Sequence, residues 1–331
     1  MTAGFANAEK TMVSRNDEFV PDLSFYRAKS PALPANPGIL TLTVGDVTVR
    51  LTGLRGSNVA TLRKRYGIFC HDDGRATDLE IRVGEAGRDQ FLRVQGTTEY
   101  YRIDTRWEAE TMTACSYEWA GWIDFSRREG GLLLADIALE TPRAFDRGLE
   151  NFLRVAYSHL IIQRGGFLLH SAGLVRNGKA HLFFGPSGSG KTTVTSLTPE
   201  AHILSDDLTM VVRDGFGEYR ACSVPFRGLF APEATSDATW PIAGFYRLIQ
   251  ASTDRLEPVF GARAVGELVG SLPFVTDRPE IANEVIDAVA FAAAKVPIFR
   301  LHFKKDRTFW QTIDAGDPGV DGFSAHKGIN P

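Results

Sequence analysis

One segment of the chain combines residue types whose chemistry depends on their spacing. Residues 185–192 read GPSGSGKT, and a second hydroxyl residue follows. The segment fits the pattern G-x-x-x-x-G-K-[ST], in which backbone N–H groups surround the α- and β-phosphates of a nucleotide. In such a loop the lysine, here Lys191, reaches the β- and γ-phosphates, and the next hydroxyl, Thr192, binds Mg²⁺. The pattern therefore predicts a site for a nucleoside polyphosphate with Mg²⁺.

The flanking residues fit this interpretation. Residues 180–184 are a short apolar run suited to a strand, and residues 191–197 can form two helical turns before Pro199 stops them. Glycines let the backbone approach phosphates closely, and the start of a helix favours an anion. A glycine-rich turn without a ligand is the alternative. The expected nucleotide-binding residues are Gly185, Pro186, Ser187, Gly188, Ser189, Gly190, Lys191, Thr192 and Thr193.

Two further places carry groups that suit phosphate chemistry. Asp206 and Asp207 follow the apolar run 202–204, and a phosphate-binding loop needs an acidic group on a neighbouring strand to hold Mg²⁺. One carboxylate could bind the metal while the other accepts a proton from an incoming hydroxyl. An acidic turn or a helix cap is the alternative for this pair. His170 lies on an apolar strand, where a structural histidine is the alternative to a functional one.

Composition limits the class of protein. The 331 residues are 44% hydrophobic and include 22 phenylalanines, so the chain can bury a large core of about two domains. The net charge of −3 gives no reason to expect a nucleic-acid or membrane partner. Three widely spaced cysteines show no metal-binding pattern, and the N-terminus lacks the apolar region of a signal peptide. We therefore expect a cytoplasmic protein.

The hydrophobic pattern divides the chain into four parts. Residues 1–36 are polar with several prolines and predict a flexible arm. Residues 37–140 contain short β segments, at 39–44, 47–51, 79–83, 91–94, 100–103 and 132–137, and predict a small β-rich domain. Residues 141–314 predict the domain that carries the phosphate chemistry, and residues 315–331 a flexible tail.

The second domain begins with a strong helical pattern at 145–160. Asn177-Gly178 predicts a hairpin that joins strands 167–175 and 180–185. Further strands are expected at 202–204, 208–212 and 298–303, and helices at 244–253, 261–270 and 280–294.

Four segments in this order resemble the catalytic domain of HPr kinase/phosphorylase. They are the sequence around His170, the GPSGSGKT loop, Ile203-Leu204-Ser205-Asp206-Asp207, and Pro225-Phe226-Arg227-Gly228. The likeness covers about residues 141–310 and is closest to HPr-kinase-like proteins with an unrelated N-terminal domain. It implies an α/β fold, a P-loop kinase domain of the HPr kinase and phosphoenolpyruvate carboxykinase type, preceded here by the small β-rich domain.

The resemblance also implies roles for particular residues. The loop with Lys191 binds ATP, Thr192 and Asp207 hold Mg²⁺, and Asp206 takes the proton of a seryl hydroxyl; the reverse order of the two aspartates stays open. His170 would lie beside the transferred phosphate. Arg227 matches an arginine of the family's signature loop, with a surface arginine as the alternative. The glutamate expected two places earlier is Pro225, so phosphorylase activity stays open.

These patterns predict an ATP- and Mg²⁺-dependent kinase that phosphorylates a hydroxyl, a serine of a protein or peptide. The alternatives are a small-molecule kinase, a carboxykinase-like enzyme, or an ATP-binding switch or scaffold with slow hydrolysis. The acceptor is not identified by any docking motif. The resemblance is compatible with a homo-oligomer.

Overall fold

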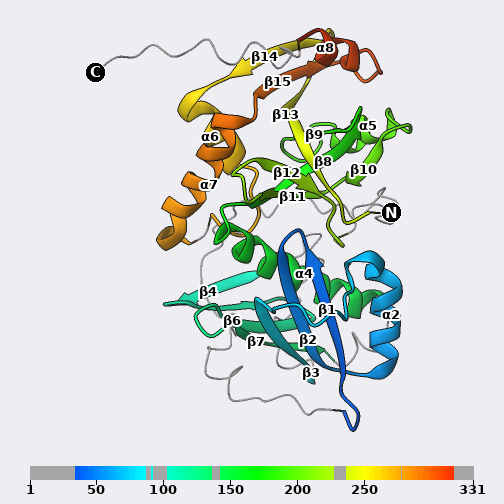
Figure 1. Ribbon diagram of the computed structural model, residues 1–331, viewed down its shortest axis with the longest axis vertical. Coiled ribbons are helices and arrows are strands. Elements are labelled where there is room, and N and C mark those ends of the chain that lie inside the picture. The colour runs from blue at the N-terminus through cyan, green and yellow to red at the C-terminus, as the bar shows by residue number, and fades with distance from the viewer. Residues whose placement is uncertain are drawn as a thin grey trace.

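The computed structural model describes residues 34–86, 91, 103–135, 142–226, 236–276 and 278–316. Their strands form two sheets, with helix α4 between them (Figure 1). The expected arm 1–36 and tail 315–331 lie almost wholly outside the described residues, as do most of the expected strands 91–94 and 100–103.

The first sheet has seven strands in the order β1-β2-β3-β7-β6-β5-β4. Strand β3 pairs in parallel with β2 and β7, and the other neighbours are antiparallel. The bounds are β1 Gly38–Val44, β2 Val47–Leu54, α2 Gly56–Tyr66, η1 Gly67–Phe69, β3 Leu79–Ala86, β4 Asp104–Glu108, β5 Thr111–Cys115, β6 Trp119–Asp124 and β7 Glu129–Ala135.

The second sheet has eight strands, and five of them close a ring of pairings. Strand β8 pairs with β11, β11 with β12, β12 with β13, β13 with β9, and β9 again with β8. The bounds are α4 Pro142–Ile162, β8 Phe167–Arg176, β9 Lys179–Phe184, α5 Lys191–Ser196, β10 His202–Ser205, β11 Leu208–Arg213, β12 Tyr219–Cys222, β13 Thr239–Gln250, β14 Arg255–Val259, α6 Gly261–Val269, η3 Pro279–Ile281, α7 Ala282–Lys295, β15 Ile298–Phe303 and α8 Phe309–Gly316.

This architecture corrects the expected fold class. An α/β kinase domain of the P-loop type alternates strands and helices around a parallel sheet, but here β-strands dominate and only the β9–β13–β15 pairings of the second sheet are parallel. The expected helix 244–253 is wrong, because residues 244–250 are the end of the long strand β13 and no helix follows them directly. Successive apolar residues of this strand pack on its two faces, with Phe245 in one hydrophobic cluster and Tyr246 and Leu248 in another, so the run has no alternation that marks a strand.

Several other expectations are confirmed. The hairpin at Asn177-Gly178 joins β8 and β9, and both turn residues have positive φ, 52° and 74°, as a two-residue hairpin turn requires. The predicted strand 298–303 coincides with β15, and the predicted helix 145–160 lies within α4.

Helix α4 packs against both sheets. Phe152 meets Trp119 of the first sheet edge to face at 5.6 Å, and the Tyr157 hydroxyl donates to the Leu42 carbonyl at 3.0 Å. The same buried cluster includes Met210 of the second sheet. One core is therefore continuous across α4, and the expected domain division at residue 141 stays a prediction. Among the described helices, none is both long and apolar enough to cross a membrane.

His159 is buried where α4 meets strand β4. Its Nδ1–H donates to the Val155 carbonyl at 3.0 Å, and its ring lies 4.9 Å from the Trp107 ring and 5.6 Å from the Phe125 ring. Burial lowers the pKa of His159 to about 4, although the bond to Val155 opposes this shift; the charge of Arg278 lowers the pKa further. The ring is therefore neutral at pH 7.

We predict that His159 makes the fold sensitive to acid. In the unfolded chain this histidine binds a proton below about pH 6.5, whereas in the folded protein it does so only near pH 4. The free energy of unfolding therefore falls as the pH falls from about 6.5 towards 4. The loss from this residue should reach about 2 kcal/mol between about pH 7.5 and about pH 5. Urea unfolding of wild type and His159→Phe at both pH values measures it. The other histidines are present in both proteins, so the difference between the two pH dependences reports on His159. Equal pH dependence of the two proteins would contradict the prediction.

Candidate functional site

The GPSGSGKT segment forms a tight loop between strand β9 and helix α5. Gly185 and Gly190 have φ values of 147° and 117°. A Cβ on Gly185 would come 2.9 Å from the Ser189 hydroxyl, and one on Gly190 would come 2.5 Å from the Phe303 ring. Both positions therefore require glycine, because a side chain would be strained and would collide.

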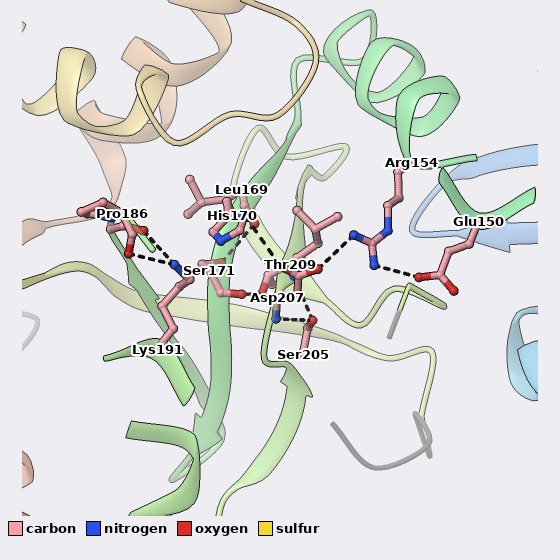
Figure 2. Close-up of polar contacts among 12 residues, drawn as sticks. Glu150, Arg154, Leu169, His170, Ser171, Pro186, Lys191, Ser205, Asp207 and Thr209 are labelled. Carbon is pink, nitrogen blue, oxygen red and sulfur yellow. Dashed lines mark hydrogen bonds and ion pairs between the residues drawn. The ribbon is translucent and has the colours of Figure 1, made fainter. Parts of the chain in front are cut away.

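Lys191 folds back into this loop. Its ammonium group donates to the carbonyl oxygens of Gly185 at 2.8 Å and Pro186 at 3.3 Å (Figure 2). At the end of β13, Gln250 donates to the Gly188 carbonyl at 2.6 Å. Burial lowers the pKa of Lys191, and the negative charge of Asp207 opposes that shift. The loop is thus fixed around its own lysine.

Asp206 and Asp207 form the turn between β10 and β11. The Ser205 hydroxyl accepts the backbone N–H of Asp207 at 3.1 Å and of Leu208 at 3.0 Å, which fixes the turn. Asp206 is buried, whereas Asp207 is partly exposed. These contacts explain why two acids follow a buried strand without extending it.

The structure brings Asp207 and His170 together. The His170 Nδ1 lies 3.7 Å from one Asp207 carboxylate oxygen (Figure 2), which is too long for a hydrogen bond but close enough for electrostatic interaction. Burial lowers the pKa of His170 to about 4; Asp207 opposes the shift, while Lys191 and Arg154 add to it. A neutral imidazole therefore lies among two cations and one anion.

Arg154 of α4 is a site residue that the sequence analysis missed. It donates to the second Asp207 oxygen at 3.0 Å and to Glu150 at 2.7 Å. Arg65 of α2 binds the other oxygen of Glu150. Burial lowers the pKa of Arg154, but Asp207 and Glu150 outweigh it and raise the pKa above its usual value. The i,i+4 spacing of Glu150 and Arg154 was the available signal, and it is also typical of solvent-exposed helix pairs.

The remaining predicted site residues are Thr192, Thr193 and Arg227. Thr192 is exposed at the second position of α5, and Thr193 is partly buried. Arg227 lies outside the described residues, whereas Phe226 before it packs under the Arg154 guanidinium at 5.8 Å. Within the described segments, no group of three or more His, Cys, Asp and Glu is arranged to hold a metal.

The loop passes a simple test for an anionic ligand. The Ser189 hydroxyl is buried beside Gly185 and has no hydrogen-bond partner among the described residues. Such a group needs a partner in the working protein. Mg²⁺ bound with a nucleotide takes much of its coordination from phosphates and water, with one or two carboxylates. Thr192 and Asp207 therefore suffice as the protein's candidate metal ligands.

We predict that Arg154 is essential for stability. In Arg154→Met, the carboxylates of Glu150 and Asp207 lose a buried partner, and the free energy of unfolding should fall by about 3 kcal/mol. The control is Arg63→Met on α2, which removes an exposed pair with Asp72 and should leave stability nearly unchanged. Urea unfolding measures both, and equal stabilities of the two variants would contradict a buried charge network.

A search of the curated proteins found no match. Residues 149–315 match the model of the family described as SynChlorMet cassette protein ScmC. The matched segment begins in α4 and includes the GPSGSGKT loop, Arg154, His170, Asp207 and the strands of the second sheet. It covers just over half of the chain, so this protein belongs to the ScmC family.

Proposed function

We propose that this protein binds ATP with Mg²⁺ at residues 185–193 and transfers the γ-phosphoryl group to a hydroxyl, a serine of a protein or peptide. The observation that supports this best is the convergence of Lys191, His170 and Asp207 beside the loop. The segments that bring them together are those that resemble HPr kinase/phosphorylase. The proposal rests on these residues and not on the fold class.

The loop would hold the nucleotide's phosphates. Backbone N–H groups and Lys191 would neutralise the β- and γ-phosphates, and Lys191 would leave the carbonyls that it now contacts. Bound Mg²⁺ would supply charge neutralisation across the β- and γ-phosphates. Phosphoryl transfer requires little covalent help, so positioning and electrostatics carry most of the catalysis.

The residues opposite the loop would handle the acceptor. As the hydroxyl oxygen bonds to the γ-phosphorus, the bond to the β–γ bridging oxygen breaks, and Asp206 accepts the hydroxyl proton. Asp207, oriented by Arg154, would contribute to the metal site. His170 has a pKa of about 4, so it would act as a neutral hydrogen-bond donor to the phosphoryl group and not as the base.

Lys191→Ala should weaken ATP binding by at least about tenfold, because a charged hydrogen-bond donor to the phosphates is lost. Its fold should persist, since the side chain lies at a surface loop. The control is Lys179→Ala, an exposed lysine at the start of β9. Titration calorimetry with ATP and Mg²⁺ measures binding, and circular dichroism checks the fold. Wild-type affinity in Lys191→Ala would argue against the loop as the nucleotide site.

The aspartates should respond differently to replacement by asparagine. The variant that loses the metal ligand should need more Mg²⁺, whereas the one that loses the base should keep ATP binding and transfer about 10²–10⁴-fold more slowly. Asp214→Asn, in the β11–β12 turn, is the control.

Wild-type enzyme is first incubated with native lysate and labelled ATP, and mass spectrometry identifies the phosphorylated acceptor. A phosphorylated metabolite, CO₂ or inorganic phosphate as the sole product would identify one of the alternative functions. Full activity in both aspartate variants would mean that Asp206 and Asp207 have only a structural role in the turn.

A further inference from the structure

A cluster of three arginines surrounds one buried carboxylate outside the residues assigned above. Glu267 of α6 accepts from the Arg300 Nε at 2.8 Å, and the same oxygen lies 3.6 Å from a nitrogen of both Arg247 and Arg263. The arginines come from β15, β13 and α6. The Glu267 side chain is only 6% exposed, while Arg247 and Arg263 are 36% and 60% exposed.

The cluster carries a surplus of positive charge. One carboxylate cannot neutralise three guanidinium groups. A second acid, Glu257 of β14, is the cross-strand neighbour of Arg300 on β15. It is bound by Arg255 at 3.1 Å and lies 3.4 Å from His302. Arg300 is the most buried of the three and holds Glu267, which leaves Arg247 and Arg263 to face solvent.

The strand that carries Arg247 also reaches the candidate site. Arg247 is the cross-strand neighbour of Phe184, the residue before Gly185. Three residues further along β13, Gln250 holds the phosphate loop through Gly188. Just after α6, the Ser271 carbonyl accepts the backbone N–H of His170 at 2.9 Å. Strand β13, which carries Arg247, therefore contacts the loop, and the segment that follows α6 contacts His170.

The ligand chemistry follows from the side chains. A guanidinium presents a planar fork of donors that matches the paired oxygens of a phosphate or carboxylate. We propose that Arg247 and Arg263 form a second anion subsite that binds a phosphate or carboxylate of the acceptor molecule. This inference rests on the proposed transferase function. The nucleotide's own phosphates have the same chemistry, and the experiment separates the two sources.

Calorimetry measures the binding of two probes, inorganic phosphate and ADP, to the full-length protein. Phosphate is titrated into the protein alone and into the protein saturated with ADP–Mg²⁺. Wild type should bind phosphate in both conditions, and more weakly at higher salt. Arg247→Gln and Arg263→Gln should each weaken phosphate binding about tenfold and leave ADP binding unchanged. Lys191→Ala should lose ADP binding yet retain the arginine-dependent phosphate binding.

Arg255→Gln is the matched control, because Arg255 is 59% exposed and lies on the neighbouring strand. It should not alter phosphate binding. The inference is overturned if wild type binds no phosphate, if the two arginine variants weaken ADP binding instead, or if Arg255→Gln has the same effect as they do. Failure of wild type to bind ADP would contradict the proposed function. In that case the phosphate titrations without ADP would still show whether Arg247 and Arg263 bind an anion.

Discussion

The bond between Arg154 and Asp207 joins helix α4 to the β10–β11 turn at the candidate site. A buried guanidinium without acidic partners would cost several kcal/mol, so α4 is held where Arg154 meets both Glu150 and the β10–β11 turn. That position fixes the Asp207 carboxylate near His170. The geometry of the candidate site therefore depends on where the helix lies, and the Arg154–Asp207 pair is one of the contacts that hold it there.

The rest of α4 is consistent with its place between two sheets. A helix at the surface would have one apolar stripe, whereas α4 is buried along most of its length from Gly148 to Ile162. Phe152 fits against Trp119, and Gly121 beside it has no Cβ; one there would lie 2.5 Å from the Phe152 ring. The first sheet thus supports the helix closely, and through it the site.

The sequence was most informative where short-range constraints dominate. The loop of residues 185–190 needs glycine at particular φ values, and the Asn177-Gly178 turn needs positive φ at both positions, so both could be predicted from residue types alone. Strand β13 could not, because apolar residues on both of its faces remove the alternation that separates strand from helix. Helix α2 and strands β4 to β6 were missed as well. Arg154 was missed because its i,i+4 pair with Glu150 does not reveal that both side chains are buried.

The charge network also changes how the first sheet is understood. Arg65, Glu150, Arg154 and Asp207 alternate in sign and together carry no net charge. In such a chain each ion neutralises the next, so an interior member cannot be removed without leaving a partner uncompensated. Arg65 belongs to α2, which packs beside β1 of the first sheet. The first sheet therefore contributes to the electrostatic balance around Asp207, and this network carries its influence to the candidate site.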